Sequence, residues 1–353
     1  MTATGIGFIG LGSIGARMLH HAASHPQVRA VAAWDPDAVR IRDGVAACPA
    51  LNAARTVEEL IARPDVDVVY VASPPLTHAG HARAAIAAGK PVLCEKPLGV
   101  DLAGSRALVA EAAGSGVLNA VNFIFASEPA TQVHQAMVRG EAGVVQCVDI
   151  QLQARQWARR RYAAAPWLRH DRQGGVVREV LSHYVYLCQR LLGPLTLDHA
   201  RVVHGNGPGE AETQVMAAMH AGPVPVRMVA CTVGAGPDQF HCTLRGERAA
   251  WLFHDLYALS RSEDGPWQLQ HSQGHPQGNP QGEPAAAWFR AQLDNIAAWA
   301  SGGAHTMPDF AAACAVQEII EGILAARGQT LWDPRATATP SRPSSPPDPL
   351  DVG

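Results

Sequence analysis

The chain has 353 residues and a formal charge of −3 at pH 7, with 28 basic residues against 31 acidic ones. This near-neutral balance excludes a general polyanion binder, so we expect no nucleic-acid partner. Hydrophobic residues make up 47% and charged residues 17%, which is typical of a folded chain with a sizeable core and not of a disordered one.

The location and redox chemistry of the protein are also indicated by composition. No run approaches the roughly 18 consecutive apolar residues of a membrane span, so we expect no membrane partner. The chain enters a strand-like run almost at once, without a basic leader, and we expect a cytoplasmic protein. Seven scattered cysteines with no CxxC spacing predict neither a disulfide framework nor a metal site.

The first 123 residues alternate between strand-like and helix-like segments. Apolar runs predict strands at 6–9, 28–34, 51–54, 66–72, 92–94 and 117–123. Helical patterns fall between them at 14–25, 36–47, 77–88 and 102–113. This alternation is typical of an α/β fold with a doubly wound parallel sheet, so we assign residues 1–123 to a Rossmann-type nucleotide-binding domain.

The pattern changes beyond residue 123. Helices are predicted at 129–139, 175–192, 285–300 and 309–326, and strands at 144–154, 198–204, 213–220, 224–233, 239–245 and 249–254. These elements indicate a second, α+β domain with a large, mostly antiparallel sheet over residues 124–332. We expect a mobile loop at 262–284 and a disordered Pro- and Ser-rich tail at 333–353.

A glycine-rich turn follows the first strand and opens the first helix, with the sequence Gly10-Leu11-Gly12-Ser13-Ile14-Gly15. It fits G-x-G-x-x-G, whose glycines and helix N-terminus bind a pyrophosphate. Asp35 ends the second strand, where a carboxylate binds the ribose hydroxyls and repels a 2′-phosphate. We therefore predict NAD as the cofactor, with NADP as the alternative because Arg40 lies nearby.

Polar residues follow three later strands of the predicted sheet, at the edge where ligands bind in such folds. Ser73 and Pro74, with His78 just beyond, follow the fourth strand, and Glu95-Lys96-Pro97 follows the fifth. Asn122 lies near the end of the sixth strand and is assigned to the same cofactor site. Lys96 is one of only two lysines in the chain, and at a strand end it can polarise a substrate oxygen. Lys90 is expected to be an ordinary exposed lysine.

The helix at 175–192 carries Glu179 and His183, four residues apart, so their side chains can meet. A carboxylate beside an imidazole orients it and raises its basicity, which suits a general base that takes a hydroxyl proton. The alternative is a surface Glu/His pair without a catalytic role.

Together these motifs resemble the glucose–fructose oxidoreductase, inositol dehydrogenase and rhizopine-catabolism (Gfo/Idh/MocA) family over roughly residues 5–330. The resemblance implies that Lys96 contacts a substrate hydroxyl, that Glu95 lies by the nicotinamide ribose and that His183 is catalytic. It also implies a homodimer or homotetramer formed through the second sheet. Pro75, Gln173 and Glu179 depart from the family pattern, as do Leu181 and Tyr186, so we expect a rebuilt substrate pocket.

An arginine cluster at 155–178 precedes the catalytic helix. One interpretation is an anionic substrate held by Arg172 and Arg178, with Trp167 stacking on a sugar ring. The alternative is a subunit interface or a solvated basic face, with the aromatic ring in the core.

We therefore expect an NAD-dependent oxidoreductase that transfers hydride between nicotinamide and a carbinol or carbonyl carbon of a sugar, cyclitol or sugar-derived small molecule. In this hypothesis His183 exchanges the hydroxyl proton, Glu179 orients His183, and Lys96 stabilises charge on oxygen. Two alternatives remain open: a glycoside hydrolase or lyase that uses transient oxidation, and a catalytically silent NAD-bound regulator.

Overall fold

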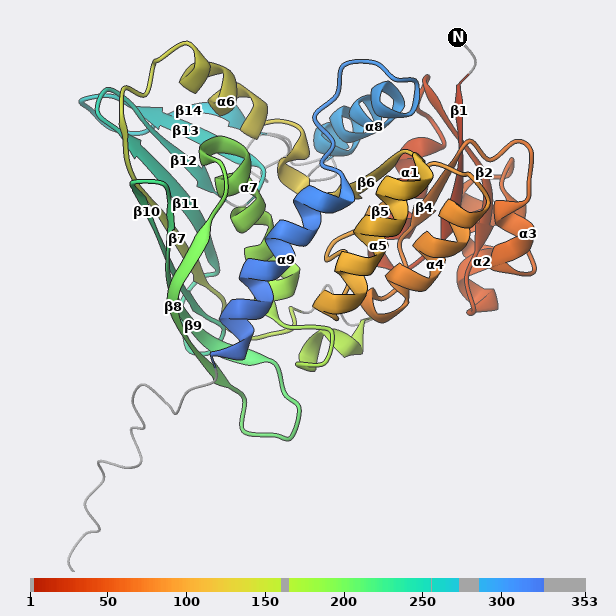
Figure 1. The fold of residues 1–353 in the computed structure, drawn as a ribbon, viewed down its shortest axis with the longest axis horizontal. Helices are drawn as coiled ribbons and strands as arrows, with labels where there is room; N and C mark the ends of the chain where they lie inside the picture. Colours follow the sequence, from red (N-terminus) through yellow and green to blue (C-terminus); the bar gives the residue numbers. More distant parts are fainter. Residues whose placement is uncertain (1–2, 160–164, 255, 273–285, 327–353) are drawn as a thin grey trace, which may run out of the picture.

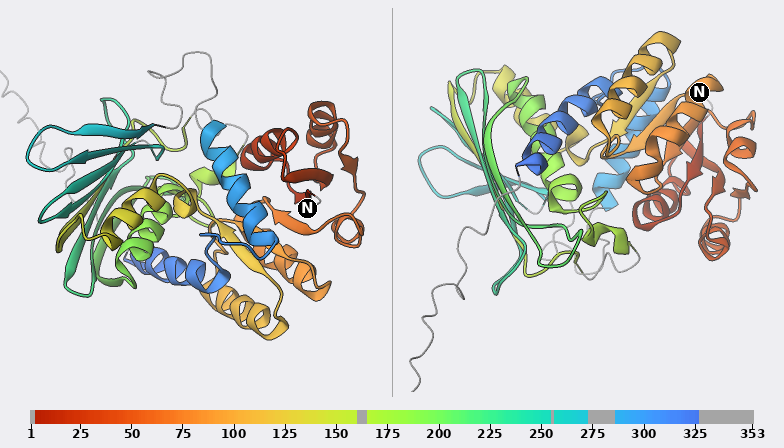
Figure 2. Two further views of the ribbon diagram at one scale, coloured as in Figure 1. Left: turned by 90° about the horizontal axis from the view of Figure 1, so that it is seen from above. Right: turned by 60° about the horizontal axis from the view of Figure 1, so that its bottom comes forward.

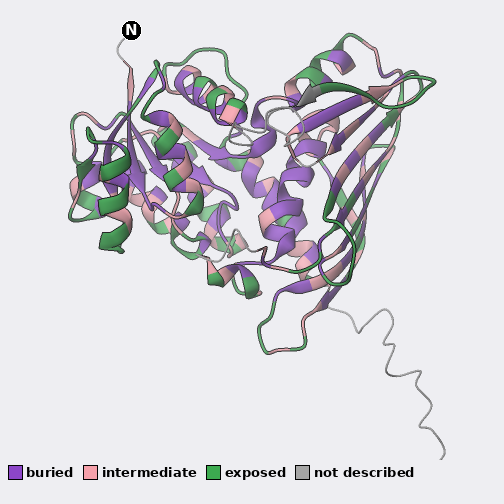
Figure 3. Ribbon diagram, turned by 180° about the vertical axis from the view of Figure 1, so that it is seen from behind, coloured by how far each residue is buried: buried purple, intermediate pink, exposed green. Residues whose placement is uncertain are grey.

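The structure is a computed structural model and describes residues 3–159, 165–254, 256–272 and 286–326. Two sheets stand on opposite sides of the molecule, with helices between them (Figure 1). Buried residues follow the strands of the first sheet and the helices that separate the two sheets (Figure 3). The predicted tail at 333–353 lies outside the described residues. No helix in these described ranges is long and apolar enough to cross a membrane.

The first sheet has six parallel strands in the order β3-β2-β1-β4-β5-β6. The strands are β1 (Thr4–Ile9), β2 (Val28–Trp34), β3 (Asn52–Ala53), β4 (Val68–Val71), β5 (Val92–Glu95) and β6 (Asn119–Asn122). The helices that connect them are α1 (Ser13–Ala22), α2 (Ala38–Ala47), α3 (Val57–Ile61), α4 (Pro75–Ala87) and α5 (Leu102–Ser115). The predicted doubly wound sheet is confirmed, and its order reverses between β1 and β4, which is where such folds bind ligands.

Short polar side chains begin several of these helices. Asp37, Thr56 and Asp101 are N-caps whose side chains accept from backbone N–H groups in the first turn of α2, α3 and α5. The apolar run of β4 is buried at all four residues, as expected for a strand covered on both faces.

The second sheet has eight strands in the order β14-β13-β12-β11-β7-β10-β9-β8. They are β7 (Val145–Gln153), β8 (Thr196–His204), β9 (Glu212–Ala221), β10 (Val224–Cys231), β11 (Gln239–Gly246), β12 (Ala250–His254), β13 (Ala258–Ser262) and β14 (Gln268–Ser272). The predicted mostly antiparallel sheet is confirmed, although β7 and β10 pair in parallel. The expected loop at 262–284 was wrong in part, because β14 pairs with β13; residues 273–284 lie outside the described residues.

The inner face of this sheet packs against helices. They are α6 (Ala130–Val138), α7 (Ser182–Leu192) and α9 (Phe310–Ala325). The predicted helix at 175–192 has two parts, because a π-helical turn, Val177–Leu181, precedes α7. Such turns occur frequently at functional sites. A 3-10 turn, Ile124–Ala126, follows β6 closely.

Helix α8 (Ala286–Ala300) returns to the first domain although it follows the second sheet in the chain. It packs beside α1 (Figure 2). Its side chains also form hydrogen bonds with the end of β6 and the residues just after it: Trp288 Nε1 donates to Ile124 O at 2.9 Å, and Gln292 Nε2 donates to Asn122 Oδ1 at 2.7 Å. The domain boundary at residue 123 stays a prediction; α8, which follows the second sheet in the chain, packs against α1 of the first domain.

Candidate active site

The glycine turn has the geometry that a bound pyrophosphate needs. Gly10 has φ +98°, and a Cβ there would lie 2.8 Å from the Ala72 backbone at the end of β4. A Cβ on Gly15 would lie 2.2 Å from Gly10 O. On Gly12 it would meet only Arg40 Nη1, at 3.8 Å. The first and third glycines thus allow close packing, and the second leaves space in front of the α1 N-terminus, where the N–H groups of Ser13 and its neighbours lack intrahelical partners.

Asp35 lies directly beyond β2, with its carboxylate beside the glycine turn. Its Oδ2 accepts from Leu11 N at 2.7 Å, and its Oδ1 accepts from Asp37 N at 2.9 Å. A carboxylate has about four acceptor positions, so two remain for the ribose hydroxyls. Arg40 Nη1 stands 3.8 Å from Asp35 Oδ2. These residues fit an adenosine ribose, and Arg40 is the group that would meet a 2′-phosphate.

His78 joins the two turns that follow β4 and β5. Its Nδ1 lies 2.8 Å from Pro97 O and its Nε2 lies 2.7 Å from Ser73 O. Burial lowers the pKa of His78 to about 4. Because both ring nitrogens face backbone carbonyls, His78 shapes the cofactor edge and offers no free ring nitrogen to a cofactor. Pro74 is the N-cap of α4, and Ser73 Oγ accepts from Thr77 Oγ1 at 2.7 Å.

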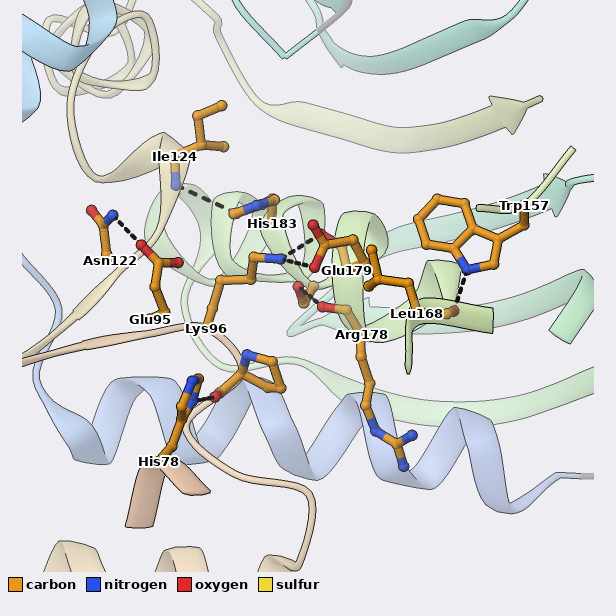
Figure 4. Close-up of polar contacts among 12 residues, drawn as sticks. His78, Glu95, Lys96, Asn122, Ile124, Trp157, Leu168, Arg178, Glu179 and His183 are labelled. Atoms are coloured by element: carbon orange, nitrogen blue, oxygen red, sulfur yellow. Dashed lines mark hydrogen bonds and ion pairs between the residues drawn. The ribbon is translucent and has the colours of Figure 1, made fainter. Parts of the chain in front are cut away.

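Lys96 bonds across the crevice to the second domain (Figure 4). Its Nζ donates to Glu179 Oε2 at 2.5 Å and to Glu179 O at 2.8 Å, and its side chain is 7% exposed. Glu179 lies in the π-helical turn. The sequence predicted that Glu179 orients His183, but the carboxylate is turned to Lys96. Two of the three ammonium hydrogens are used in this way, which leaves one for a substrate oxygen.

His183 lies close to this pair, on the first turn of α7 (Figure 4). Its Nδ1 accepts from Ile124 N at 3.4 Å, and its ring meets Phe123 edge to face at 5.9 Å. Burial, and then the positive charge of Lys96, hold the pKa of His183 well below its ordinary value. The imidazole is therefore neutral at pH 7, and because Nδ1 is an acceptor the ring hydrogen is on Nε2.

Glu95, which precedes Lys96 in the chain, is hydrogen-bonded to Asn122 and to a third residue. Asn122 Nδ2 donates to Glu95 Oε1 at 2.6 Å, and Tyr70 in β4 donates its hydroxyl to the same oxygen at 2.5 Å. Burial raises the pKa of Glu95, while these two donors act in the opposite direction. Sequence reasoning missed Tyr70; its only signal was a hydroxyl within an otherwise apolar strand.

The helical segment that carries Glu179 and His183 begins against a buried carboxyl group that the sequence did not reveal. Glu212 Oε1 accepts from Val177 N at 2.5 Å, and Glu212 is 1% exposed. Gly175 has φ +98°, and a Cβ there would lie 2.3 Å from Glu212 Oε2. Burial raises the pKa of Glu212 to about 7. This contact holds the start of the segment that carries Glu179 and His183.

Arg178, a predicted substrate contact, points away from Lys96 (Figure 4). Its guanidinium makes two bonds, of 2.8 and 2.7 Å, to the carboxylate of Glu321 on α9, and its Nη1 donates to Asp171 O at 2.5 Å. This buried ion pair anchors the helix start to α9. The position of Arg178 therefore does not support the predicted substrate contact.

The hydrogen bonds of Lys96 within the described residues do not include Trp167 or Arg172, the other predicted substrate residues. Arg172 is exposed, and Trp167 lies half-buried in a 3-10 turn, Pro166–Arg169. Arg159 Nε lies 3.4 Å from Asp238 Oδ2. Trp157 Nε1 donates to Leu168 O at 2.7 Å, which fixes this segment internally (Figure 4). Arg160 and Arg161 lie outside the described residues.

The N-terminal domain matches a known protein family. Residues 4–123 match the model of an oxidoreductase family with an NAD-binding Rossmann fold, named GFO_IDH_MocA. Inositol 2-dehydrogenase of Acidiphilium cryptum (strain JF-5) is 37% identical over 142 residues, which are 39% of this chain and 42% of that protein. A 1-carboxy-3-chloro-3,4-dihydroxycyclohexa-1,5-diene dehydrogenase of Comamonas testosteroni is 42% identical over 97 residues, 28% of this chain and 24% of the relative.

The similarity of fold extends across both domains. A levoglucosan dehydrogenase solved with NADH and levoglucosan aligns with a TM-score of 0.78 over 92% of this chain and 97% of that one, at 20% identity. In sequence, the chain spans less than half the length of the curated relatives named above. Residues 4–123 form an NAD-binding Rossmann domain that matches the oxidoreductase family model GFO_IDH_MocA.

Proposed function

We propose that the protein is an NAD-dependent dehydrogenase or reductase that interconverts a carbinol and a carbonyl group in a sugar- or cyclitol-like small molecule. The observation that carries the proposal is the Lys96–Glu179 contact, because it places an ammonium group with a free hydrogen beside His183 in the cofactor crevice. The relatives named for inositol and levoglucosan supply the substrate class.

Lys96 and His183 have different roles at the substrate oxygen. Bound nicotinamide supplies or accepts the hydride. Lys96 and the Nε2–H of His183 both donate to the oxygen and stabilise the negative charge that develops on it. His183 is neutral with its hydrogen on Nε2, so it acts as a donor, and the predicted role as general base passes to Lys96. In reduction Lys96 gives its proton to the oxygen; in oxidation the uncharged amine takes it back.

The anionic-substrate interpretation receives no support from the arginines that suggested it. Arg178 is held by Glu321, and Arg159 lies beside Asp238. We therefore propose an uncharged polyol whose hydroxyl groups are recognised by hydrogen bonds.

The test is turnover with NAD and a panel that includes myo-inositol, levoglucosan and simple aldoses, followed by the absorbance of NADH. Net NADH formation is expected. Substrate consumption without net NADH would instead support the hydrolase or lyase alternative. Absence of turnover across the panel, together with recovery of a protein partner, would favour the silent regulator.

Two variants of the wild-type enzyme separate chemistry from cofactor binding. Lys96→Met is expected to lower kcat by at least about 100-fold while the Kd for NADH changes little, because the ammonium acts at the substrate oxygen. Leu76→Ala, at an exposed residue of α4, is the control and should keep kcat near the wild-type value. A Lys96→Met enzyme with full activity would refute the role of Lys96.

We also propose a homo-oligomer formed through the outer face of the second sheet. Met216 on β9 and Val229 on β10 are register partners on this face and are 46% and 50% exposed. Neighbouring exposed apolar side chains on one face of a sheet are a feature of protein–protein interfaces. Met216→Lys is expected to reduce the mass measured by light scattering, whereas Val138→Lys, at a 75%-exposed residue of α6, should not. A wild-type monomer would refute the proposal.

A further inference from the structure

A buried network of hydrogen bonds extends across three adjacent strands next to Lys96. Tyr70 in β4, Glu95 at the end of β5 and Asn122 at the end of β6 meet at one oxygen, Glu95 Oε1. Gln292 on α8 donates to Asn122 Oδ1 at 2.7 Å. Tyr70 and Gln292 are fully buried and Asn122 is 3% exposed, so these groups have little access to water.

The donors Gln292, Asn122 and Tyr70 fix the direction of each hydrogen bond in this network. Because Asn122 Oδ1 accepts from Gln292, the amide group of Asn122 turns its Nδ2 to Glu95. Tyr70 has a single hydrogen, which is directed to the same carboxylate oxygen. Two donors that converge on one oxygen favour the ionised carboxylate over the neutral acid. They oppose the effect of burial, which alone would favour the neutral acid.

The location of Glu95 relates this network to the cofactor. The glycine turn and Asp35 occupy the β1–β2 half of the sheet edge, and a dinucleotide extends from there across the switch point between β1 and β4. Glu95 lies on the other half, immediately before Lys96. A carboxylate fixed on that half can accept from hydroxyl groups of the nicotinamide end.

We propose that Tyr70 and Asn122 are positioning residues that keep Glu95 ionised and correctly oriented for the nicotinamide half of the cofactor, and that α8 supports them through Gln292. The proposal rests on the proposed function for the identity of the ligand. Helix α8 also bonds Ile124 O through Trp288, and Ile124 N donates to His183. The same helix therefore supports both Glu95 and His183 through the segment 122–124.

The test removes one hydroxyl. In Tyr70→Phe the Glu95 carboxylate loses a charge-assisted hydrogen bond, and its pKa is expected to rise. NADH affinity, measured by fluorescence titration across pH, should therefore fall about tenfold on the acid side of the new pKa and recover as the pH is raised. A purely structural role for Tyr70 would instead weaken binding equally at every pH.

Tyr186→Phe is the matched control. Tyr186 is a buried tyrosine on α7 that stacks on Phe123, and its hydroxyl is not among the donors to Glu95. The same chemical change there should leave the pH dependence of NADH binding where it is in the wild type. Circular dichroism checks that both variants are folded. Gln292→Met, which removes the donor to Asn122 Oδ1 and to Met307 Sδ, should give a smaller shift than Tyr70→Phe.

Difference infrared spectroscopy supplies a readout that needs no cofactor. The carbonyl band of a protonated carboxyl group is expected to titrate at a higher pH in Tyr70→Phe than in the wild type, and to vanish in Tyr70→Phe/Glu95→Gln. Failure of the wild type to bind NADH would refute the proposed function and leave this band as the test of the network. An unshifted band and a parallel binding curve would overturn the inference.

Discussion

Glu212 is the buried carboxyl group at the start of the helical segment that carries His183. Replacement of Glu212 by glutamine tests whether ionisation of this group lowers the free energy of unfolding. Glutamine can keep the acceptor for Val177 N, because its amide oxygen can take the position of Oε1. The amide nitrogen then replaces Oε2, which has no hydrogen-bond partner among the described residues. The substitution therefore removes the titration while it preserves the shape and the contact.

The magnitude follows from the shift in pKa. Glu212 has a pKa of about 7 in the folded protein against 4.5 ordinarily. The folded state therefore binds more protons than the unfolded state between these values, and stability falls as the pH rises through that window. The full shift corresponds to about 3 kcal/mol, which is retained below pH 4.5 and lost above pH 7. Glu212→Gln has no such loss.

The assay is urea unfolding of both proteins at several pH values from 4.5 to 8. The difference in free energy of unfolding, variant minus wild type, is expected to rise by about 3 kcal/mol across this range, because other titrations cancel in the difference. Gly175→Ala is a second probe, expected to be destabilised at every pH, since its φ is +98° and its Cβ would contact Glu212. A difference that does not change with pH would refute the reasoning.

Three further substitutions test contacts elsewhere. Asp35→Ser should weaken NAD binding and favour NADP, since the repelling carboxylate is removed and Arg40 remains; an unchanged ratio of the two Kd values would contradict this. Arg178→Met should lower the free energy of unfolding by about 3–5 kcal/mol, because Glu321 keeps a partly buried charge, and a loss below 1 kcal/mol in urea unfolding would contradict it. Lys90→Met should cost about 1–3 kcal/mol in the same assay because two carbonyls lose their donor, whereas an exposed lysine would cost nothing measurable.

The parallel sheet was predictable because each strand and its helix carry a local signal. The glycine turn, Asp35 and the apolar run of β4 fall where the sequence placed them, since each depends on neighbours within a few residues or on one strand–helix unit. Strand β14 was missed because its polar composition resembles a loop and its pairing with β13 decides its conformation.

The partners of the site residues were less predictable, because they come from distant segments. Glu179 and His183 are four apart, a spacing that allows contact, yet Lys96 competes for the carboxylate from 83 residues away. The competition is uneven because the ammonium group carries a full positive charge that attracts the carboxylate, whereas a neutral imidazole carries none. Lys90 was expected to be exposed, but its Nζ donates to two backbone carbonyls, of Arg63 and Val66.

Two departures from the family pattern that the sequence placed in different domains meet in the structure. Pro75 begins α4 and has no N–H, and Pro74, the N-cap, has no side chain that can accept. The free N–H of Leu76 donates instead to Gln173 Oε1 at 3.3 Å, so the second domain provides the missing cap. The resemblance to the family implies a glycine at residue 173 and commonly an asparagine at residue 75. That glycine could not make this bond, and that asparagine would supply an N–H of its own. Gln173 therefore joins the two domains beside the turn that carries Ser73.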